Sequence, residues 1–310
     1  MSTAPAKLEV VDEISSQPHR SLWGDVWQQF RKHKLAMFGS FVLVFIILAV
    51  IFGPYLWTVD PEYIDIVAAY SSPSAAHPLG ADNLGRDTLA RVLTGGRISL
   101  AVGITSMLLA MLIGTVVGGL AGYYPRLDGP LMRLTDMFFA LPQLPLLLVI
   151  ILLFRETLRS LIGPEAGIFI LIVFVIGVLA WMPTARLVRG EVLSIKEQEF
   201  VTAAVSIGTK NRRILTRHIF PNVLSPIMVA ATLGVANAIL TESALSFLGL
   251  GFPPDFPTWG RILFDGKDQL TLAPALVMAP GLAISLTVLS VNFIGDGLRD
   301  ALDPRLRGRS

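Results

Sequence analysis

The chain has 310 residues, of which 53% are hydrophobic and 15% are charged, and its mean hydropathy is +0.64. These values exclude an ordinary soluble domain and predict a membrane protein. The chain contains no cysteine, which excludes disulfides, thiolate nucleophiles and cysteine-ligated metals. The histidines lack the spacing of metal ligands, so we expect no metal site; they are His19, His33, His77 and His218.

Apolar runs recur along the chain at lengths that suit a membrane-spanning helix, which needs roughly 20 residues. Because backbone polar groups must be satisfied internally in hydrocarbon, these runs predict an all-α membrane protein with six transmembrane helices. The runs cover residues 35–57, 98–122, 137–154, 167–185, 223–250 and 272–294. The first run is too long for a signal peptide and no small-residue cleavage pattern follows it, so we interpret it as a retained anchor.

The segment before the first run divides into two parts. We expect residues 1–17 to form a disordered cytoplasmic tail and residues 18–34 to form an interfacial amphipathic helix. The bulky residues on one face of that helix are Leu22, Trp23, Val26, Trp27 and Phe30. Aromatic residues followed by a basic cluster are typical of the membrane–water boundary. This pattern favours an anchor on the inner leaflet over a docking site for a partner.

Lysine and arginine predict the orientation, because cytoplasmic loops carry an excess of both. With six spans, most of the 25 Lys and Arg residues fall on the side of the N-terminus. We therefore expect both termini in the cytoplasm, including a C-terminal tail over residues 298–310.

Two segments then face the other side. Residues 58–97 form an extracytoplasmic loop, in which glycines at positions 80, 85, 95 and 96 predict turns around a short surface helix. Residues 251–271 are rich in proline and are expected to be stiff and irregular. These two surfaces either cap the bundle or receive a soluble delivery protein.

Glu242 is the one ionisable residue within the predicted apolar runs. A carboxylate at membrane depth marks either a proton-coupling site or a hydrogen-bonded structural group that faces the bundle interior. The sequence shows no second buried partner, so we favour the structural role. A coupling role would instead make the chain a secondary transporter or a channel.

Small residues and prolines characterise several of the runs. Gly114, Gly118 and Gly122 recur at four-residue spacing, which predicts close helix packing in lipid. Prolines are expected to interrupt the third and sixth spans, where kinked helices either line a pathway or are structural. These prolines are Pro142, Pro145, Pro274 and Pro280.

The connector over residues 186–222 is longer and more basic than a simple turn requires. One predicted helix carries Phe200, Val201, Ala204 and Ile207 on a single stripe and stops at Gly208, where a turn follows at Thr209. A second short helix is predicted to carry Ile214, Leu215, His218 and Ile219 and to end before Pro221 and the fifth span. Two helices that meet at Gly208 predict a compact, basic knob suited to docking into a groove of another protein.

The connector does not bind ATP through a phosphate loop. The nearest match to GxxxxGK[ST] ends at Gly208-Thr209-Lys210, and Ala203 stands where the first glycine is required.

These residues resemble the integral-membrane permease subunits of ABC importers. That family carries a cytoplasmic EAA loop, matched here by Thr202-Ala203-Ala204, then Gly208, then Ile219-Phe220-Pro221. Thr202 departs from the family, which often has glutamate there. HPLGADNLGRD, SALSFLGLG, PPDFPTWG and GDGLRDALDPRLRG resemble the C-type permeases of dipeptide and oligopeptide importers and their glutathione relatives. The resemblance extends from about residue 20 to 308.

The resemblance implies a type I ABC importer transmembrane domain over residues 98–297, with five helices and a coupling loop at 186–222. It implies a second homologous permease, two ATPase subunits that hold ATP and Mg, and an extracytoplasmic solute-binding protein. The chain itself is then not catalytic, binds no cofactor, contacts lipid but not nucleic acid, and lies in a bacterial inner membrane. The residues assigned to ATPase coupling are Glu199, Phe200, Thr202, Ala203, Ala204, Ser206, Gly208, Thr209 and Arg212.

Alternative functions have less support in the sequence. A secondary transporter or channel needs its own coupling-ion site or selectivity ring, and Glu242 is the one candidate. An intramembrane hydrolase needs paired catalytic groups within the spans, which the runs lack. The solute stays open among dipeptide, oligopeptide and glutathione, because nothing in the spans reads as a site for a peptide terminus.

Overall fold

The structure, a computed structural model, describes residues 22–302. Within that range the regular structure is helical, apart from one isolated antiparallel bridge between Ala81 and Asp87. The predicted tail over residues 1–17 lies outside the described residues. The long helices are α3 (Lys34–Leu56), α4 (Thr88–Tyr123), α5 (Pro125–Phe139), α6 (Gln143–Ile162), α7 (Pro164–Leu179), α8 (Trp181–Lys196), α11 (Phe220–Phe247) and α13 (Ala275–Leu302). The short elements are α2 (Leu22–Lys32), η1 (Ile66–Ala68), α9 (Glu199–Ser206), α10 (Asn211–Ile214), the π-helical η2 (Leu215–Ile219), α12 (Trp259–Gly266) and η3 (Lys267–Gln269).

The described helices provide five spans, and six when one bent helix pair is counted as a single span. Five stretches are long and apolar enough to cross a membrane: α3, α4, α7 with α8, α10 with η2 and α11, and α13. The sixth is the pair α5 and α6, which bends by 82° at the break between them. Pro142 is the N-cap residue of α6 at this break. The break falls at Leu141, because proline disfavours helical geometry in the residue before it.

Several boundaries differ from the predicted ones because local hydrogen bonds extend the helices. Residues 88–97 belong to α4, since the Asp87 carboxylate accepts a hydrogen bond from the backbone N–H of Ala90 at 2.7 Å and caps the helix there. Gly95 and Gly96 therefore lie inside a helix and not in turns. Residues 186–196 continue α8, and residues 298–302 continue α13, so the loop and the tail predicted there begin later.

Two predicted interruptions are absent from the described helices. The second short helix of the connector does not end before the fifth span, because η2 joins α10 to α11. Pro221 has no N–H for an i→i−4 hydrogen bond, and a π turn before it accommodates that loss. In α13, Pro274 precedes the helix and Pro280 lies near its start, so the helix continues unbroken.

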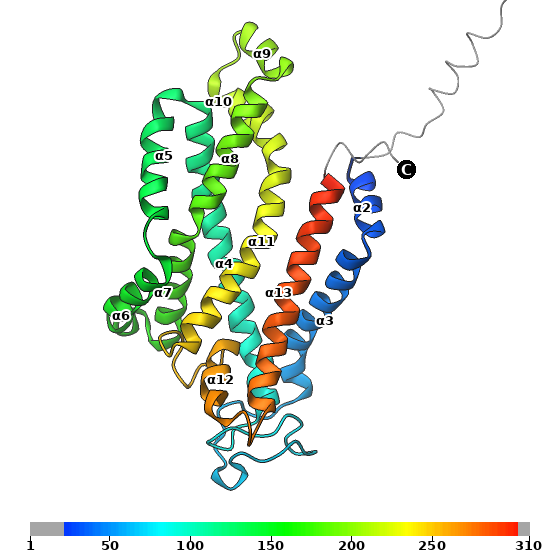
Figure 1. The fold of residues 1–310 in the computed structure, drawn as a ribbon, viewed down its shortest axis with the longest axis vertical. Coiled ribbons are helices and arrows are strands. Elements are labelled where there is room, and N and C mark those ends of the chain that lie inside the picture. The colour runs from blue at the N-terminus through cyan, green and yellow to red at the C-terminus, as the bar shows by residue number, and fades with distance from the viewer. Residues whose placement is uncertain (1–21, 303–310) are drawn as a thin grey trace, which may run out of the picture.

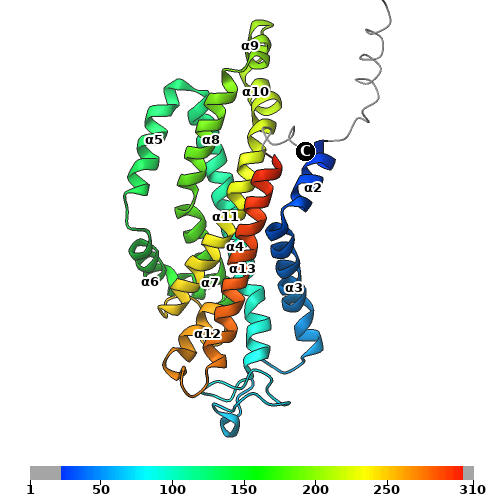
Figure 2. The ribbon, with the colours of Figure 1, turned by 45° about the vertical axis from the view of Figure 1, so that its right-hand side comes forward.

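The helices run roughly along one axis, and the bundle has two distinct ends (Figures 1 and 2). α2, α9 and α10 lie at one end, which we call the α9 end. The loop over residues 57–87 and α12 lie at the other, which we call the α12 end. α4 packs against α8, α11 and α7, and α13 packs against α3 and α11. α4 is therefore the helix that connects both ends to the rest of the bundle.

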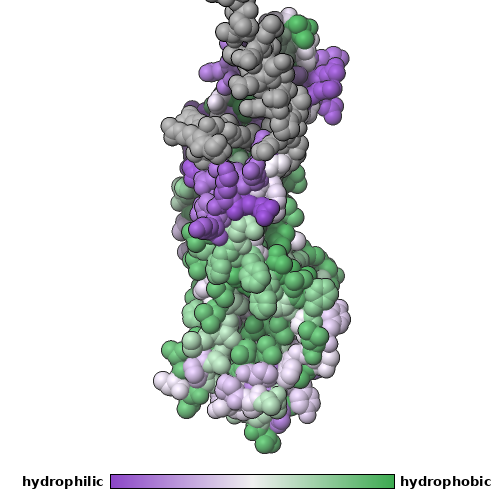
Figure 3. All heavy atoms as spheres, turned by 90° about the vertical axis from the view of Figure 1, so that its right-hand side faces the viewer, coloured by the Kyte–Doolittle hydropathy of each residue, from purple (hydrophilic) through white to green (hydrophobic). Residues whose placement is uncertain are grey.

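The face formed by α3, α13 and α2 carries a broad hydrophobic surface (Figure 3). Many large apolar side chains of α3 are exposed, including Phe38, Phe41 and Phe45. A hydrophilic band borders this surface toward the α9 end. This distribution fits a helix bundle whose middle zone faces hydrocarbon.

Gly114, Gly118 and Gly122 of α4 lie against α8. A Cβ at Gly114 would lie 2.6 Å from Thr184 Cβ, and one at Gly122 would lie 2.8 Å from Val192 Cβ. A Cβ at Gly118 would overlap the carbonyl oxygen of Ala185. Each contact is too close for any side chain, so the three glycines let the backbones of α4 and α8 approach one another.

We predict that Gly118→Ala destabilises the protein by about 1–3 kcal/mol, because the new methyl group forces α4 and α8 apart. Thermal melting of the detergent-solubilised protein measures the change. Gly119→Ala is the matched control, since a Cβ at Gly119 meets no atom within 4 Å. Equal melting temperatures for the two variants would contradict the packing described here.

Candidate functional site: the α9 loop and the buried polar clusters

The α9 loop projects from its end of the bundle and is held by two buried side chains (Figure 1). Val201 and Ala204 are buried and pack in a cluster with Val192, Ile214 and Ile219. These contacts attach one face of α9 to α8 and to the chain that leads into α11. The position of α9 is therefore fixed relative to two spans.

Gly208 ends α9 through its backbone conformation. Its φ is +76°, in the left-handed region that glycine adopts without strain. The N–H of Gly208 bonds the carbonyl of Val205 at 2.9 Å, and the N–H of Thr209 bonds that of Ala204 at 3.1 Å. This pair of bonds is the Schellman motif. A Cβ at Gly208 would meet no atom within 4 Å, so the conformation and not close packing requires glycine.

The other predicted coupling residues lie on the exposed side of the loop. Of the predicted helical stripe, Val201 and Ala204 are buried, whereas Phe200 and Ile207 are 46% and 82% exposed. Phe200 is one residue from Val201 and so points to the flank of α9, and Ile207 follows the last helical residue. Val205 is also exposed. Exposed or half-exposed polar and small members of the set are Glu199, Thr202, Ala203, Ser206, Thr209 and Arg212.

Thr202 and Ser206 bond within their own helix. The Thr202 hydroxyl donates to the carbonyl of Gln198 at 3.3 Å, and the Ser206 hydroxyl donates to the carbonyl of Thr202 at 3.0 Å. Both side chains therefore support the local helix and leave the apolar side chains as the exposed features of the loop.

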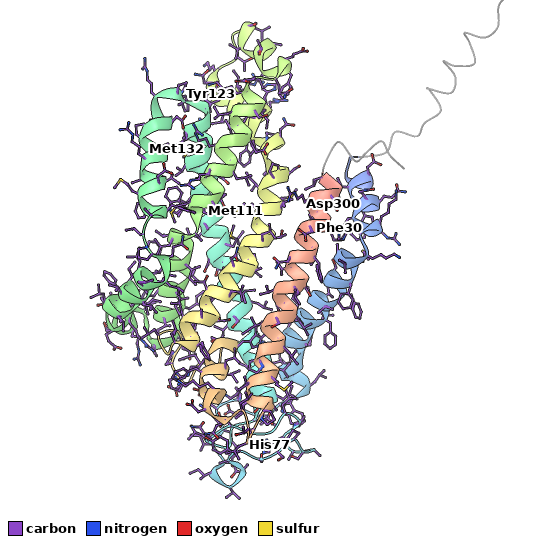
Figure 4. All side chains as sticks on the ribbon, viewed as in Figure 1. Phe30, His77, Met111, Tyr123, Met132 and Asp300 are labelled. Carbon is purple, nitrogen blue, oxygen red and sulfur yellow. The ribbon has the colours of Figure 1, made fainter. Side chains whose placement is uncertain are left out.

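The base of the loop is fastened to α4 by contacts that the sequence did not predict. The Lys196 ammonium donates to the carbonyl of Tyr123 at 3.1 Å, and the Tyr123 hydroxyl donates to Asn211 Oδ1 at 3.1 Å. Tyr123 is the last residue of α4 and lies at the α9 end (Figure 4). The ends of α4, α8 and α10 thus meet at one point. Their polar groups are far apart in the sequence, so no local pattern indicates the contact.

Glu242 lies in a buried network of hydroxyl groups near the α12 end of α11. Its carboxylate accepts hydrogen bonds from Ser246 at 2.7 Å and from Ser99 of α4 at 3.1 Å. Ser243 lies at 3.5 Å. Glu242 itself is fully buried. The two serines of α11 are visible in the sequence, whereas Ser99 enters only through the packing of α4.

The same network fastens α12. The Thr258 hydroxyl donates to Ser246 Oγ at 3.3 Å and caps α12 by accepting from the N–H of Arg261 at 3.2 Å. The backbone N–H of Trp259 donates to Ser99 Oγ at 3.2 Å, and its indole N–H donates to the carbonyl of Val92 at 2.9 Å. α4, α11 and α12 therefore share one set of hydrogen bonds around Glu242.

A second polar cluster at the α12 end consists of ion pairs and was not predicted. Arg91 of α4, which is 1% exposed, contacts Asp82 of the loop and lies 3.1 Å from Asp265 of α12. Arg86 Nε donates to Asp82 at 2.7 Å, and Arg261 lies 2.9 Å from Asp265. The sequence shows these charges but places them all in exposed loops. Pairing between distant segments is what buries them.

The same region fixes the start of α4. The Asp87 carboxylate, besides capping the helix, accepts from the Trp57 indole at 3.0 Å and contacts His77 Nδ1 at 2.9 Å. His77 lies at the α12 end, far from Tyr123 (Figure 4). The loop over residues 57–87 is thus attached to α4 along its length.

Among residues 22–302, no group of three or more histidine, aspartate or glutamate side chains has the arrangement of a metal site. Pro142 lies at the α5–α6 bend and Pro280 is buried in α13; neither side chain contributes a charge or a hydrogen-bond donor.

A chain of the MetNI methionine ABC transporter, solved in inward-facing conformations, has a similar fold. The similarity covers 67% of this chain and 95% of that one, with a TM-score of 0.52 and 18% sequence identity. Residues 110–308 match the family described as binding-protein-dependent transport system inner membrane component. The chain belongs to this family. Residues 21–73 also match the N-terminal TM domain of oligopeptide transport permease C.

Curated relatives of this permease match it over most of both chains. The oligopeptide transport system permease protein OppC of Bacillus subtilis is 40% identical, over 95% of this chain and 93% of its own length. The glutathione transport system permease protein GsiD of Pectobacterium atrosepticum is 40% identical, over 97% of each. The dipeptide transport system permease protein DppC of Bacillus subtilis is 41% identical, over 94% of this chain and 88% of its own length.

We predict that Asp265→Asn destabilises the permease by about 1–3 kcal/mol, because Arg261 loses its counter-charge and the buried Arg91 and Arg86 keep only Asp82. A lower melting temperature of the purified protein measures the loss. Asp268→Asn is the control, since Asp268 lies three residues away on the exposed surface. A melting temperature of Asp265→Asn equal to that of the control would show that the cluster contributes nothing to stability.

We also predict that Glu242→Gln keeps substantial transport and stability, because glutamine retains one oxygen that accepts from Ser246, and its amide N–H replaces the second oxygen and donates to the Ser99 hydroxyl. Glu242→Leu removes every acceptor and strands buried hydroxyls, so it is expected to lower the melting temperature. Solute uptake into cells together with thermal melting distinguishes the two variants. Abolished uptake by a stable Glu242→Gln protein would assign the charge a direct role in transport.

Proposed function

We propose that this chain is the permease subunit of an ATP-binding cassette importer for peptides, that it forms half of the translocation pathway, and that the α9 loop couples it to an ATPase. The observation that carries the proposal is the set of exposed apolar side chains on α9 and at its end. Phe200 and Val205 are exposed on the two flanks of the side that Val201 and Ala204 bury, and exposed Ile207 follows the end of the helix. A rigid helix with exposed apolar side chains suits insertion into a groove of a second protein.

The partners follow from the family and from the two ends of the bundle. Two cytoplasmic ATPase subunits would hold ATP and Mg, and one of them would receive α9. A second, homologous permease would complete the pathway. An extracytoplasmic solute-binding protein would deliver solute at the α12 end. The excess of Lys and Arg at the α9 end supports a cytoplasmic position for that end and for both termini in a bacterial inner membrane.

The contacts around α9 suggest how motion would pass into the membrane. α9 packs on α8 and on the segment that becomes α11, and its base joins Tyr123 at the end of α4. α11 then continues to Glu242 at the α12 end. Nucleotide binding must favour one of two arrangements of these helices, and a displaced α9 would bias that choice.

The relatives name the class of solute. Those with about 40% identity carry oligopeptide, dipeptide or glutathione transport in their names, which supports a peptide as the transported molecule. Glu242 contacts hydroxyl groups of its own chain, an environment that supports a structural carboxylate over a coupling site.

The proposal is tested by co-producing the chain with its permease and ATPase partners and measuring peptide-stimulated ATP hydrolysis and uptake in liposomes. We expect both activities in the complex and neither in the isolated chain. Uphill transport by the isolated chain would overturn the proposal.

We predict that Gly208→Glu leaves the protein in the membrane but uncouples ATP hydrolysis from uptake, because an L-residue with a φ of +76° is strained and alters the end of α9. Gly208→Asn is the control, since asparagine adopts the left-handed conformation more readily. The ratio of peptide transported to ATP hydrolysed measures coupling. Full coupling in a normally assembled Gly208→Glu complex would exclude this role for the turn.

A further inference from the structure

Part of the apolar face of α2 packs against α13 and therefore cannot contact the membrane. Val26 and Phe30 are buried against Ala301 and its neighbours on α13, and the Phe30 ring would lie 3.1 Å from a Cβ at Gly297. The side chains of Leu22 and Trp23, which were predicted on the same face, lie outside the described part of the chain. The bulkiest buried contacts of α2 are therefore with protein, whereas Trp27, Arg31 and Lys32 are exposed among residues 22–302.

The outward face of α2 combines an aromatic ring with positive charge. Trp27 is 57% exposed and stacks on Phe30 with ring centroids 6.0 Å apart, so the indole is held in place. Arg31 follows one helical turn later and Lys32 lies beside it, and both are exposed. Lys34, also exposed, begins α3. One face thus presents an indole and three cations.

This face lies where the hydrophobic surface of α3 ends. Leu35, Phe38 and Phe41 are exposed on α3 directly below the basic residues, and Figure 3 shows the hydrophilic band bordering the hydrophobic surface there. An indole beside cations at such a border is suited to the headgroup region of a bilayer.

The break between α2 and α3 keeps the two surfaces aligned. His33 caps α3, because its Nδ1 accepts a hydrogen bond from the N–H of Ala36 at 3.1 Å. Its Nε2 lies 3.7 Å from Asp300 of α13. Of the acidic groups on α2 and the end of α13, Asp300 pairs with His33. No salt bridge within residues 22–302 involves Arg31, Lys32 or Lys34.

We propose that Trp27, Arg31, Lys32 and Lys34 form a binding surface for an anionic phospholipid of the leaflet at the α9 end. The phosphate would bind the cations, and the acyl chains would lie along the exposed phenylalanines of α3. Charge complementarity at the end of an apolar helix favours a lipid, since an anion without acyl chains uses only half of this surface. The inference is independent of the transported solute.

The test is quenching of Trp27 by brominated lipid, with the full-length chain in its complex in nanodiscs. The nanodiscs contain equal fractions of phosphatidylglycerol and phosphatidylcholine, and either lipid carries the bromine in its acyl chains. Subtracting the signal of Trp27→Phe isolates Trp27 from the other tryptophans. We expect more quenching by brominated phosphatidylglycerol than by brominated phosphatidylcholine, and a smaller difference at high salt.

Arg31→Gln with Lys32→Gln should reduce the excess of quenching by brominated phosphatidylglycerol by roughly fivefold or more at low salt. Each basic residue near an anionic membrane surface strengthens lipid binding by a factor of about five. Arg31→Lys with Lys32→Arg keeps the charge and should keep the excess, which separates lost charge from misfolding. Lys210→Gln with Arg213→Gln removes two exposed cations from the α9–α10 region and should leave the excess unchanged.

Four results would overturn the proposal. One is equal quenching by both lipids in the wild-type complex. Another is an undiminished excess of quenching by brominated phosphatidylglycerol in the variant that combines Arg31→Gln and Lys32→Gln. The third is an excess abolished by soluble glycerol phosphate, which would assign a site for a free anion. Occupation of the face by an acidic segment of a partner subunit would leave Trp27 unquenched by either lipid and would likewise exclude the lipid.

Discussion

The close approach of α4 and α8 is the contact on which the rest of the bundle depends. In lipid, apolar side chains gain little by leaving hydrocarbon for protein, so helices associate through close packing and hydrogen bonds. Gly114, Gly118 and Gly122 provide a groove on α4 into which the backbone and small side chains of α8 fit. α9 follows α8 in the chain, and α4 extends to the α12 end. The contact between α4 and α8 therefore fixes the positions of the two ends of the bundle relative to each other.

Polar contacts are concentrated at the two ends of the bundle. At the α12 end, Glu242 and its hydroxyl partners join α4, α11 and α12, and the ion pairs of Arg91 join α4 to the loop and to α12. A buried charge without a partner is strongly destabilising, so these groups require the segments to stay together. The α12 end is therefore a rigid cap held together by buried hydrogen bonds and ion pairs. The α9 loop is attached through one buried apolar side and a few hydrogen bonds at its base.

This asymmetry suits the proposed coupling. A rigid cap keeps the α12 ends of the helices together, and a helix at the other end that presents apolar side chains can receive a partner. The continuous path from α10 through η2 into α11 joins the two regions within one chain segment. α2, packed on α13, adds a third element at the α9 end and relates the bundle to the headgroup region of the membrane.

The sequence alone determined the fold class, the positions of the long apolar helices and the position of the turn at Gly208. These depend on local properties: the length of apolar runs, the small-residue spacing and the left-handed conformation that glycine permits. The sequence also indicated the docking loop, but the helical periodicity that places Phe200, Val201, Ala204 and Ile207 on one stripe does not show which of them the bundle covers. Only the tertiary structure decided which side of α9 and α2 is covered, that Arg91 is buried with Asp82 and Asp265, and that Ser99 completes the site of Glu242. These features join residues far apart in the chain, and their burial is a property of helix packing that no single segment encodes.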